Sequence, residues 1–286
     1  MAYQIITDSG CDLPGSILQE LGVRTVSLCL NFQGGSREDS VDDGIRELYD
    51  AFRAGETAST SAVNPDGWAG VMEPALQAGD DLLVIAFSSG LSTTYQSAVI
   101  AAEDLKQTYP DRRIFVLDSL CASLGQGLLV WYACKKRNEG MDIDALAQWC
   151  EERKWNLCHW FTVDDLMFLK RGGRISAATA LVGTMLKIKP VLHVDDEGHL
   201  ISVSKARGRK ASIEALCEKA VSLGAGYDNS TMVICHGDCL EDAEYLSQLV
   251  KERCGVKDVF IGYTGAVIGS HSGPGTLALF FLGEKR

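Results

Sequence analysis

The sequence is poor in basic residues, with 27 Lys and Arg against 38 Asp and Glu and a formal net charge of -11. Proteins that bind nucleic acids gain affinity when Lys and Arg release counterions from phosphates, and this chain has no excess of either. We therefore expect no nucleic acid partner. No apolar run is as long as a membrane span, and no basic segment followed by an apolar one opens the chain. These features predict a cytoplasmic protein without stable membrane insertion.

The chain also lacks CxxC pairs, although it contains ten cysteines. Most of them lie inside apolar segments, as Cys29 and Cys134 do, where a reduced cysteine behaves as a small core residue. One group resembles a metal site and lies at a predicted strand end: Cys235, His236, Asp238 and Cys239. Because no second pair of ligands accompanies it, the sequence predicts no metal site.

Three motifs with a defined chemistry are missing. There is no GxxxxGK[ST] loop, and no GxGxxG opens a helix after a strand, so a nucleotide is not the expected ligand. No GxSxG nucleophile elbow occurs either. We expect no cofactor.

What is present is an alternation of apolar and amphipathic segments in a chain of 286 residues, long enough for one large or two medium domains. Short apolar runs bounded by turn residues predict buried strands at 3–7, 24–32, 82–87 and 113–118. Amphipathic stretches predict helices at 13–22, 41–55, 65–79, 93–109, 122–140 and 143–155. This α/β pattern predicts a parallel sheet with helices on both faces.

The second half has a different order of predicted elements. A helix and a Gly-Gly turn precede a predicted hairpin around 196–198, and strands are predicted at 230–237 and 257–263 between helices at 210–224 and 240–255. We place a domain boundary between an N-terminal α/β domain, 1–157, and a second α/β domain, 158–286.

Hydroxyl side chains gather in four places, three of them after predicted strands and one, Thr60-Ser61, ahead of a predicted helix. The four places are Thr7-Asp8-Ser9, Thr60-Ser61, Ser88-Ser89 and Asp118-Ser119. Ligands of open parallel sheets bind beyond the carboxyl ends of the strands, and hydroxyls with free backbone N–H groups suit a carboxylate or a phosphate. Each place is equally well explained as a helix cap, since Ser, Thr and Asp are the preferred capping residues.

Two stretches in the second half have the same ambiguity. Lys170, Arg171 and Arg174 surround a Gly-Gly turn, which is typical of a helix C-terminus as well as of a basic site. His271 lies in what the sequence predicts to be a tight loop of Gly, Ser and Pro, where little packing would explain a histidine.

Seven stretches in the same order resemble the DegV family of bacterial fatty-acid-binding proteins, which includes the B subunit of fatty acid kinase. They are IITDSGCDLP, TSAVNPDGW, FSSGLSTTYQSA, VLDSLCASLGQG, DDLMFLKRGGRIS, LKIKPVLHVDDEGHL and VIGSHSGPGTLALFF. The resemblance covers essentially the whole chain. It implies a two-domain α/β fold with a long-chain fatty acid between the domains.

The resemblance also implies roles for individual residues. The head group of the fatty acid would be held by Thr60, Ser61, Ser88, Ser89, Ser92 and His271. Arg171 and Arg174 would face a partner or lie beside the head group, and the segment from about 265 to 286 would pack back near the ligand. A separate ATP-dependent kinase subunit would phosphorylate the carboxylate, so this chain would be a non-catalytic carrier that contacts membranes transiently at most.

One position departs from the family pattern. Thr93 stands where Leu-Ser-Gly-Thr-Tyr would place a glycine, which adds a Cβ and a hydroxyl beside the predicted head-group site. Two alternatives to the kinase subunit stay open. One is a lipid-binding regulatory or storage protein. The other is a serine hydrolase with Ser88 or Ser89 as nucleophile and with His271 and Asp8 or Asp118 in support.

Overall fold

The computed structural model describes residues 2–176 and 188–286, so the first two residues of the LKIKPVLHVDDEGHL stretch lie outside the described residues. Its first sheet is fully parallel and has the strand order β2-β1-β6-β7. The strands are β2 (Arg24–Val26), β1 (Tyr3–Asp8), β6 (Asp81–Ala86) and β7 (Ile114–Asp118).

Helices cover both faces of this sheet, as the sequence predicts. On one face lie α3 (Pro65–Gln77) and α4 (Thr94–Thr108), and on the other α1 (Gly15–Leu21), α5 (Leu124–Asn138) and α6 (Ile143–Arg153). All six residues of β6 are consequently buried, which explains why this strand reads as a continuous apolar run.

The predicted strand 24–32 is wrong in one respect, because it is two strands in two different sheets. After β2 the strand is interrupted at Leu28, whose N–H donates to Ser9 Oγ (3.0 Å) and whose carbonyl oxygen accepts the N–H of Asp39 (2.9 Å). These contacts from distant segments interrupt the strand, and nothing in its local sequence marks the break.

The second sheet has six strands in the order β10-β9-β8-β13-β11-β12, and only β11 and β12 pair in parallel. The strands are β10 (Leu200–Arg207), β9 (Ile188–Val194), β8 (Leu157–Thr162), β13 (Leu277–Leu282), β11 (Thr231–His236) and β12 (Asp258–Tyr263). The predicted hairpin is confirmed as the turn between β9 and β10. Two central strands, β8 and β13, are not predicted from the sequence.

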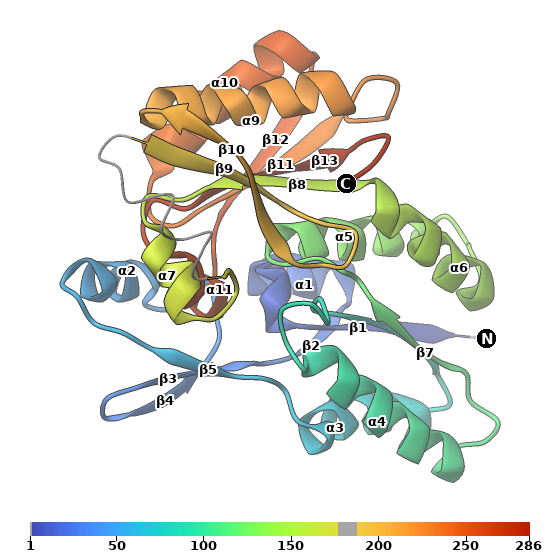
Figure 1. Ribbon diagram of the computed structural model, residues 1–286. Helices are drawn as coiled ribbons and strands as arrows, with labels where there is room; N and C mark the ends of the chain where they lie inside the picture. Colours follow the sequence, from blue (N-terminus) through green and yellow to red (C-terminus); the bar gives the residue numbers. More distant parts are fainter. Residues whose placement is uncertain (1, 177–187) are drawn as a thin grey trace.

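Together the two sheets form a layered molecule (Figure 1). Helices α9 (Arg209–Leu223) and α10 (Leu240–Cys254) cover the outer face of the second sheet. Helix α5 lies between the two sheets, and one hydrophobic cluster joins side chains of both to it, among them Ile85, Leu129 and Phe280. The two sheets therefore share a core through α5.

A third, small sheet lies beside the two large ones. Its strands are β4 (Gly35–Glu38), β3 (Cys29–Phe32) and β5 (Ser59–Ser61), and near it lie α2 (Ile45–Arg53), α7 (Leu166–Arg171) and α11 (Ala266–Ser272), on the left of Figure 1. Among the described residues, Ser9–Cys11 and Lys154–Asn156 form short 3₁₀ helices.

The sequence interpretation of a tight loop around His271 is wrong, because His271 lies in the last turn of α11. Small residues allow this helix to pack closely. Gly269 approaches the ring of Tyr49 so nearly that a Cβ would overlap its hydroxyl oxygen, and Val267 N–H is held by Asp39 Oδ1 at 2.8 Å. Tertiary contacts therefore stabilise a helix that glycine and serine would not favour alone.

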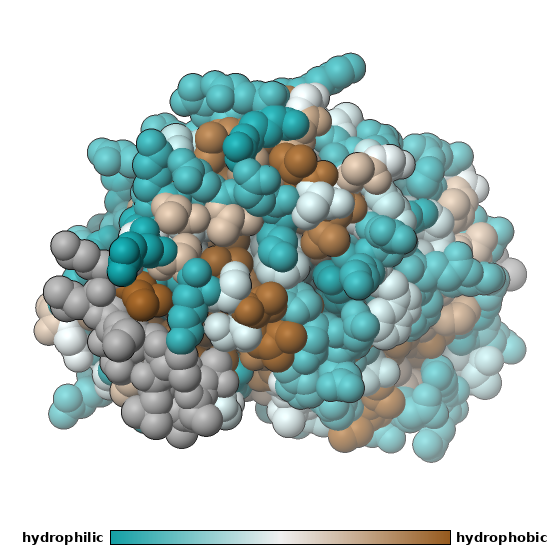
Figure 2. Space-filling view, turned by 45° about the horizontal axis from the view of Figure 1, so that its top comes forward, coloured by the Kyte–Doolittle hydropathy of each residue, from teal (hydrophilic) through white to brown (hydrophobic). Residues whose placement is uncertain are grey.

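Polar residues cover much of the surface. Figure 2 shows one face as mainly hydrophilic, with hydrophobic residues gathered toward its centre. No helix within 2–176 or 188–286 is long and apolar enough to cross a membrane. All ten cysteines are free thiols, and seven are fully buried, as expected for reduced core residues.

Candidate functional site

A cavity of about 450 Å³ lies between the two large sheets. Its size is typical of a pocket for a small organic ligand. Apolar side chains from both halves of the chain form most of its wall: Leu28, Phe87, Leu91, Phe161, Leu169, Val194, Leu200, Val267, Ile268, Ala278 and Phe280. Because β13 and α11 contribute several of them, the C-terminal segment is part of the wall.

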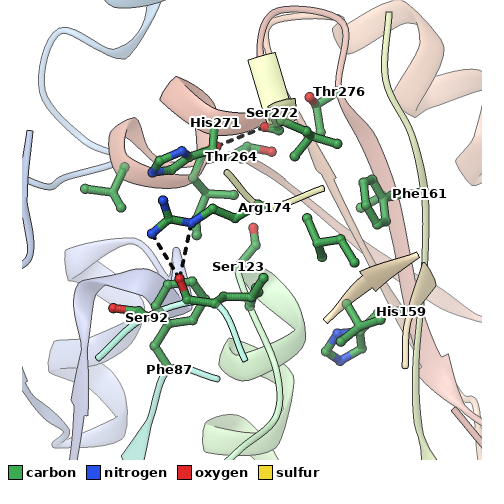
Figure 3. A pocket seen from close by; sticks show the side chains of 18 of the residues that line it. Phe87, Ser92, Ser123, His159, Phe161, Arg174, Thr264, His271, Ser272 and Thr276 are labelled. Atoms are coloured by element: carbon green, nitrogen blue, oxygen red, sulfur yellow. Dashed lines mark hydrogen bonds between the residues drawn. The ribbon is translucent and has the colours of Figure 1, made fainter. Parts of the chain in front are cut away.

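Arg174 brings a positive charge into this cavity (Figure 3). Its Nε and Nη2 donate to the carbonyl oxygen of Leu91 at 3.2 and 3.0 Å, and its Nη1 donates to the carbonyl of Gly172. A guanidinium has five N–H groups. Three are used in these bonds, and the described residues accept none of the other two. Arg174 is thus anchored and still able to bind an anion.

His271 lies beside Arg174 and faces Thr60, whose Oγ1 is 2.9 Å from its Nε2. Both residues line the cavity. Burial, and secondarily the charge of Arg174, lower the pKa of His271 to about 4. The imidazole is therefore neutral at physiological pH, so one ring nitrogen donates and the other accepts.

We expect His271 to show this pKa directly. Its ring resonances in NMR spectra should change with a midpoint near pH 4, and they should stay constant between about pH 5.5 and 8. Because the folded state binds fewer protons than the unfolded state between pH 4 and the ordinary value of 6.5, this group stabilises the fold above 6.5. That contribution is lost as the pH falls toward 4. His271→Gln assigns the resonances, and a midpoint near 6.5 would contradict the buried, neutral ring.

The serine loop that follows β6 contributes Ser89, Ser92 and Thr93 to the cavity wall. Ser92 Oγ shares a hydrogen bond with Thr94 Oγ1 (2.8 Å) and accepts the Thr94 N–H at 3.2 Å. Thr93 has φ -78°, which any residue adopts, so the departure from glycine introduces no backbone strain. Its hydroxyl extends the polar part of the wall.

Two of the predicted head-group residues, Ser61 and Ser88, are not among the described residues that line the cavity. Ser61 Oγ accepts a hydrogen bond from Asn31 Nδ2 at 2.8 Å on an exposed strand. Ser88 is fully buried, and its Oγ donates to the carbonyl of Gly198 at 2.9 Å in the turn between β9 and β10. Both hydroxyls join chain segments, and the ligand contact predicted for them from the sequence stays a prediction.

The contact between Ser88 and Gly198 holds the hairpin of the second sheet against the first. Gly198 has φ +77°, and a Cβ there would overlap Ser88 Oγ. We expect Gly198→Ala to lower the free energy of unfolding by about 3 kcal/mol, of which about 1 kcal/mol comes from the left-handed backbone.

The matched control is Gly79→Ala, because Gly79 has φ +89° and no atom within 4 Å of an added Cβ. Urea denaturation of both variants separates the two costs. Equal losses would show that the hairpin contact contributes nothing beyond backbone strain.

The geometry does not support a serine hydrolase. His271 pairs with Thr60, whereas Ser88 Oγ is bound to Gly198. Asp8 accepts the N–H groups of Gly10 and Phe87 at 3.0 and 2.8 Å, and burial raises its pKa to about 7. Asp118 Oδ1 accepts the N–H groups of Ser89 and Leu120, both at 3.1 Å. In the described part of the chain, no hydrogen bond joins a serine, a histidine and an aspartate in sequence.

A second hollow, of about 190 Å³, adjoins the polar end of the cavity and shares Thr60, Arg174 and His271 with it. Arg171 is exposed at its margin, and its guanidinium lies 4.6 Å from the centre of the Phe168 ring. Of the two predicted arginines, therefore, Arg174 points into the cavity and Arg171 lies at the surface.

The sequence interpretation missed polar residues on the wall away from Arg174. His159 and Phe161 lie on β8, across the cavity from Arg174 and His271 (Figure 3). They are two residues apart, so the alternation of a strand puts them on one face. Ser123 also lines the cavity, and its Oγ donates to Asp12 Oδ2. The sequence does contain a signal for His159 and Phe161. If LCHWFT is interpreted as a strand, its alternation places both side chains on the same face.

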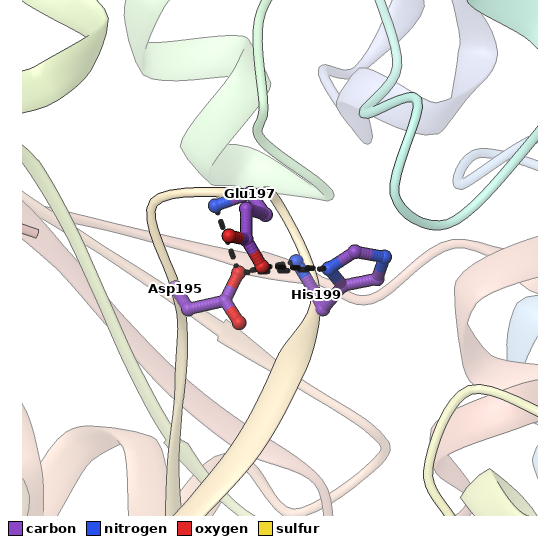
Figure 4. A group of neighbouring side chains, drawn as sticks. All are labelled: Asp195, Glu197 and His199. Carbon is purple, nitrogen blue, oxygen red and sulfur yellow. Dashed lines mark hydrogen bonds and ion pairs between the residues drawn. The ribbon is translucent and has the colours of Figure 1, made fainter.

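Within the described residues, the one group of possible metal ligands is Asp195, Glu197 and His199 (Figure 4). It lies at the exposed turn between β9 and β10, and His199 Nδ1 is 3.9 Å from each acid. Asp195 Oδ1 accepts the N–H groups of Glu197 and His199, so the turn itself explains this acid.

Comparison with known proteins agrees with this architecture. The family described as "Uncharacterised protein, DegV family" matches residues 2–284. A DegV domain-containing protein of Clostridium perfringens is 43% identical over 99% of this chain and 98% of its own length.

Solved structures also match this chain over nearly its whole length. "Fatty Acid Binding of a DegV family Protein from Thermus thermophilus" has a TM-score of 0.89 and 32% identity, over 99% of this chain and 100% of that one. The fatty acid kinase B3 protein of Streptococcus pneumoniae, loaded with linoleic acid, shares the fold with a TM-score of 0.87 and 23% identity, over 99% and 100% of the two chains. From the sequence match and the shared architecture, we conclude that this chain belongs to the DegV family.

Proposed function

We propose that this chain binds one long-chain fatty acid in the cavity between its two sheets and presents the carboxylate to a separate ATP-dependent kinase subunit in the cytoplasm. The observation that carries the proposal is a largely apolar cavity of about 450 Å³ with the guanidinium of Arg174 at one end. The related protein of Thermus thermophilus is a fatty-acid-binding member of the same family.

The polar end suits a carboxylate. Arg174 offers two N–H groups, and the neutral His271 and the hydroxyls of Thr60, Ser92 and Thr93 lie on the same part of the wall. A charge-assisted hydrogen bond to arginine is stronger than one between neutral groups. Because the pKa of His271 is held near 4, the imidazole adds hydrogen bonding without a second charge.

The apolar wall supplies most of the affinity. Burying a methylene contributes about 0.8 kcal/mol, so a sixteen-carbon chain gains roughly 12 kcal/mol before the costs of binding are subtracted. The head-group site then needs only to orient the carboxylate.

The second hollow supports the transfer step. It adjoins the cavity at Thr60, Arg174 and His271, and exposed residues such as Ser59 and Arg171 border it. A carboxylate at Arg174 is therefore within reach from the surface while its alkyl chain stays buried. The kinase supplies ATP and magnesium, and this chain acts as a non-catalytic carrier that then holds the acyl-phosphate.

We expect Arg174 to affect fatty acid binding and Arg171 to affect phosphoryl transfer from the kinase subunit. We expect Arg171→Glu to leave fatty acid affinity unchanged and to slow acyl-phosphate formation about tenfold with the kinase subunit, because charge complementarity sets the rate of encounter. Isothermal titration with the fatty acid and a phosphorylation assay measure the two effects. A loss of fatty acid affinity would place Arg171 in the binding site.

Native and then denaturing mass spectrometry of the purified chain tests the binding function. A non-covalent adduct with the mass of a long-chain fatty acid supports the proposal. A chain that carries no such adduct and takes up no added fatty acid contradicts it. Labelling by a fluorophosphonate probe would instead favour the hydrolase.

Reconstitution with a kinase subunit and ATP then distinguishes the carrier from a storage or regulatory protein. Acyl-phosphate formed only when both proteins are present supports the proposal. Binding of fatty acid without acyl-phosphate, in the presence of a kinase that is active with another carrier, would favour the storage role.

A further inference from the structure

His159 is a polar residue in an apolar part of the cavity wall. It is 1% exposed, yet it lines the cavity. Within the described residues neither its Nδ1 nor its Nε2 has a hydrogen-bond partner. Buried polar side chains are nearly always paired, so an unpaired histidine facing a ligand cavity calls for a partner on the ligand.

The ring is held in place by close packing. It meets Phe280 edge to face with centroids 5.3 Å apart, and a Cβ on Gly125 would lie 2.6 Å from its Nε2. The glycine in the first turn of α5 thus makes room for an imidazole on β8. Burial lowers the pKa of His159 well below its ordinary value, so the ring is neutral and has one N–H donor and one acceptor nitrogen.

The hydroxyl of Ser123 is a second polar group on the cavity wall. Its Oγ is already hydrogen-bonded within the protein, to Asp12 Oδ2 and to Cys235 Sγ at 3.3 Å, and it can accept one more hydrogen bond from a ligand. An unsubstituted alkyl chain would leave both ring nitrogens of His159 without a partner. A hydroxyl or oxo group on the chain would accept the N–H of His159, and a hydroxyl could also donate to either residue.

We propose that His159 selects fatty acids that carry a hydroxyl or oxo group on the alkyl chain, away from the carboxylate. This inference rests on the proposed fatty acid binding and adds the class of ligand. Arg174 and His271 lie across the cavity from His159 (Figure 3), so one ligand has its carboxylate at one site and its second oxygen at the other.

Competition binding tests the inference with octadecanoic acid and a series of hydroxy- and oxo-octadecanoic acids, the oxygen placed at successive carbons. We expect at least one oxygenated acid to bind about tenfold more tightly than octadecanoic acid. His159→Phe keeps an aromatic ring and removes both nitrogens. It should lose this preference and bind octadecanoic acid at least as well as the native chain.

The matched control is His193→Phe. His193 lies on the neighbouring strand β9, stacks on Trp160 at 4.7 Å and is not among the described residues that line the cavity. This variant should keep the preference. Equal or weaker binding of every oxygenated acid by the native chain overturns the inference, and so does a preference that survives in His159→Phe. Failure to bind octadecanoic acid as well would overturn the proposed function along with it.

Discussion

Replacing Arg174 by methionine should weaken the binding of long-chain fatty acids about 100-fold, or roughly 3 kcal/mol. The side chain of methionine keeps most of the apolar volume but offers no donor to the carboxylate. The carboxylate would then lie unpaired beside the neutral His271, and burying an unpaired charge is costly. Isothermal titration with hexadecanoic acid measures the loss.

Two further variants make this result specific. Arg171→Met removes an arginine of the same turn that lies at the surface, and it should bind as the native chain does. Arg174→Lys keeps the charge but loses the fork that bridges Leu91 and the ligand, so its affinity should be intermediate. An unchanged affinity in Arg174→Met, with the fold intact by circular dichroism, would move the carboxylate elsewhere in the cavity.

Filling the cavity should lower fatty acid affinity by a similar factor, because it removes the space for the alkyl chain and leaves the head-group site in place. Ala278 lies on β13 and lines the cavity with Phe280, two residues further along the same strand. Ala278→Phe places a ring in the space of the alkyl chain. We expect affinity for hexadecanoic acid to fall about 100-fold, because overpacking and lost methylene burial add.

Chain length distinguishes this variant from Arg174→Met. Ala278→Phe should bind octanoic acid nearly as well as the native chain, whereas Arg174→Met should weaken short and long acids alike. Tryptophan fluorescence or calorimetry with an acid series gives both dependences. If Ala278→Phe binds hexadecanoic acid normally, the alkyl chain does not pass β13.

The sequence predicts the first sheet well because its strands are short apolar runs between amphipathic helices. It also predicts that hydroxyls gather at the carboxyl edge of this sheet. It could not separate Ser88 from Ser89. The two are adjacent serines, yet one is bound to Gly198 of the hairpin and the other lines the cavity. That difference depends on a contact 110 residues away in the chain.

His271 and Arg174 show a similar limit. The helix that carries His271 contains one glycine and two serines among its seven residues, and it forms because Tyr49 and Asp39 pack against it and hold it. Arg171 precedes the Gly-Gly turn and Arg174 follows it, but only the side chain of Arg174 is held inward, by the carbonyl of Leu91. Neither contact can be predicted from the helix or turn propensities of the neighbouring residues.

The sequence by itself determined the α/β class, the net negative charge, the membership of the DegV family and the residue types that could hold a carboxylate. Those follow from composition, periodicity and an ordered set of motifs, all of which are properties of neighbouring residues. The tertiary structure alone decided which of these side chains meet. It brought Thr60, Arg174 and His271 together from β5, the turn after α7 and α11, and it placed His159 opposite them. Such meetings depend on how two sheets pack around one helix, and long-range packing is not encoded in any short stretch of the chain.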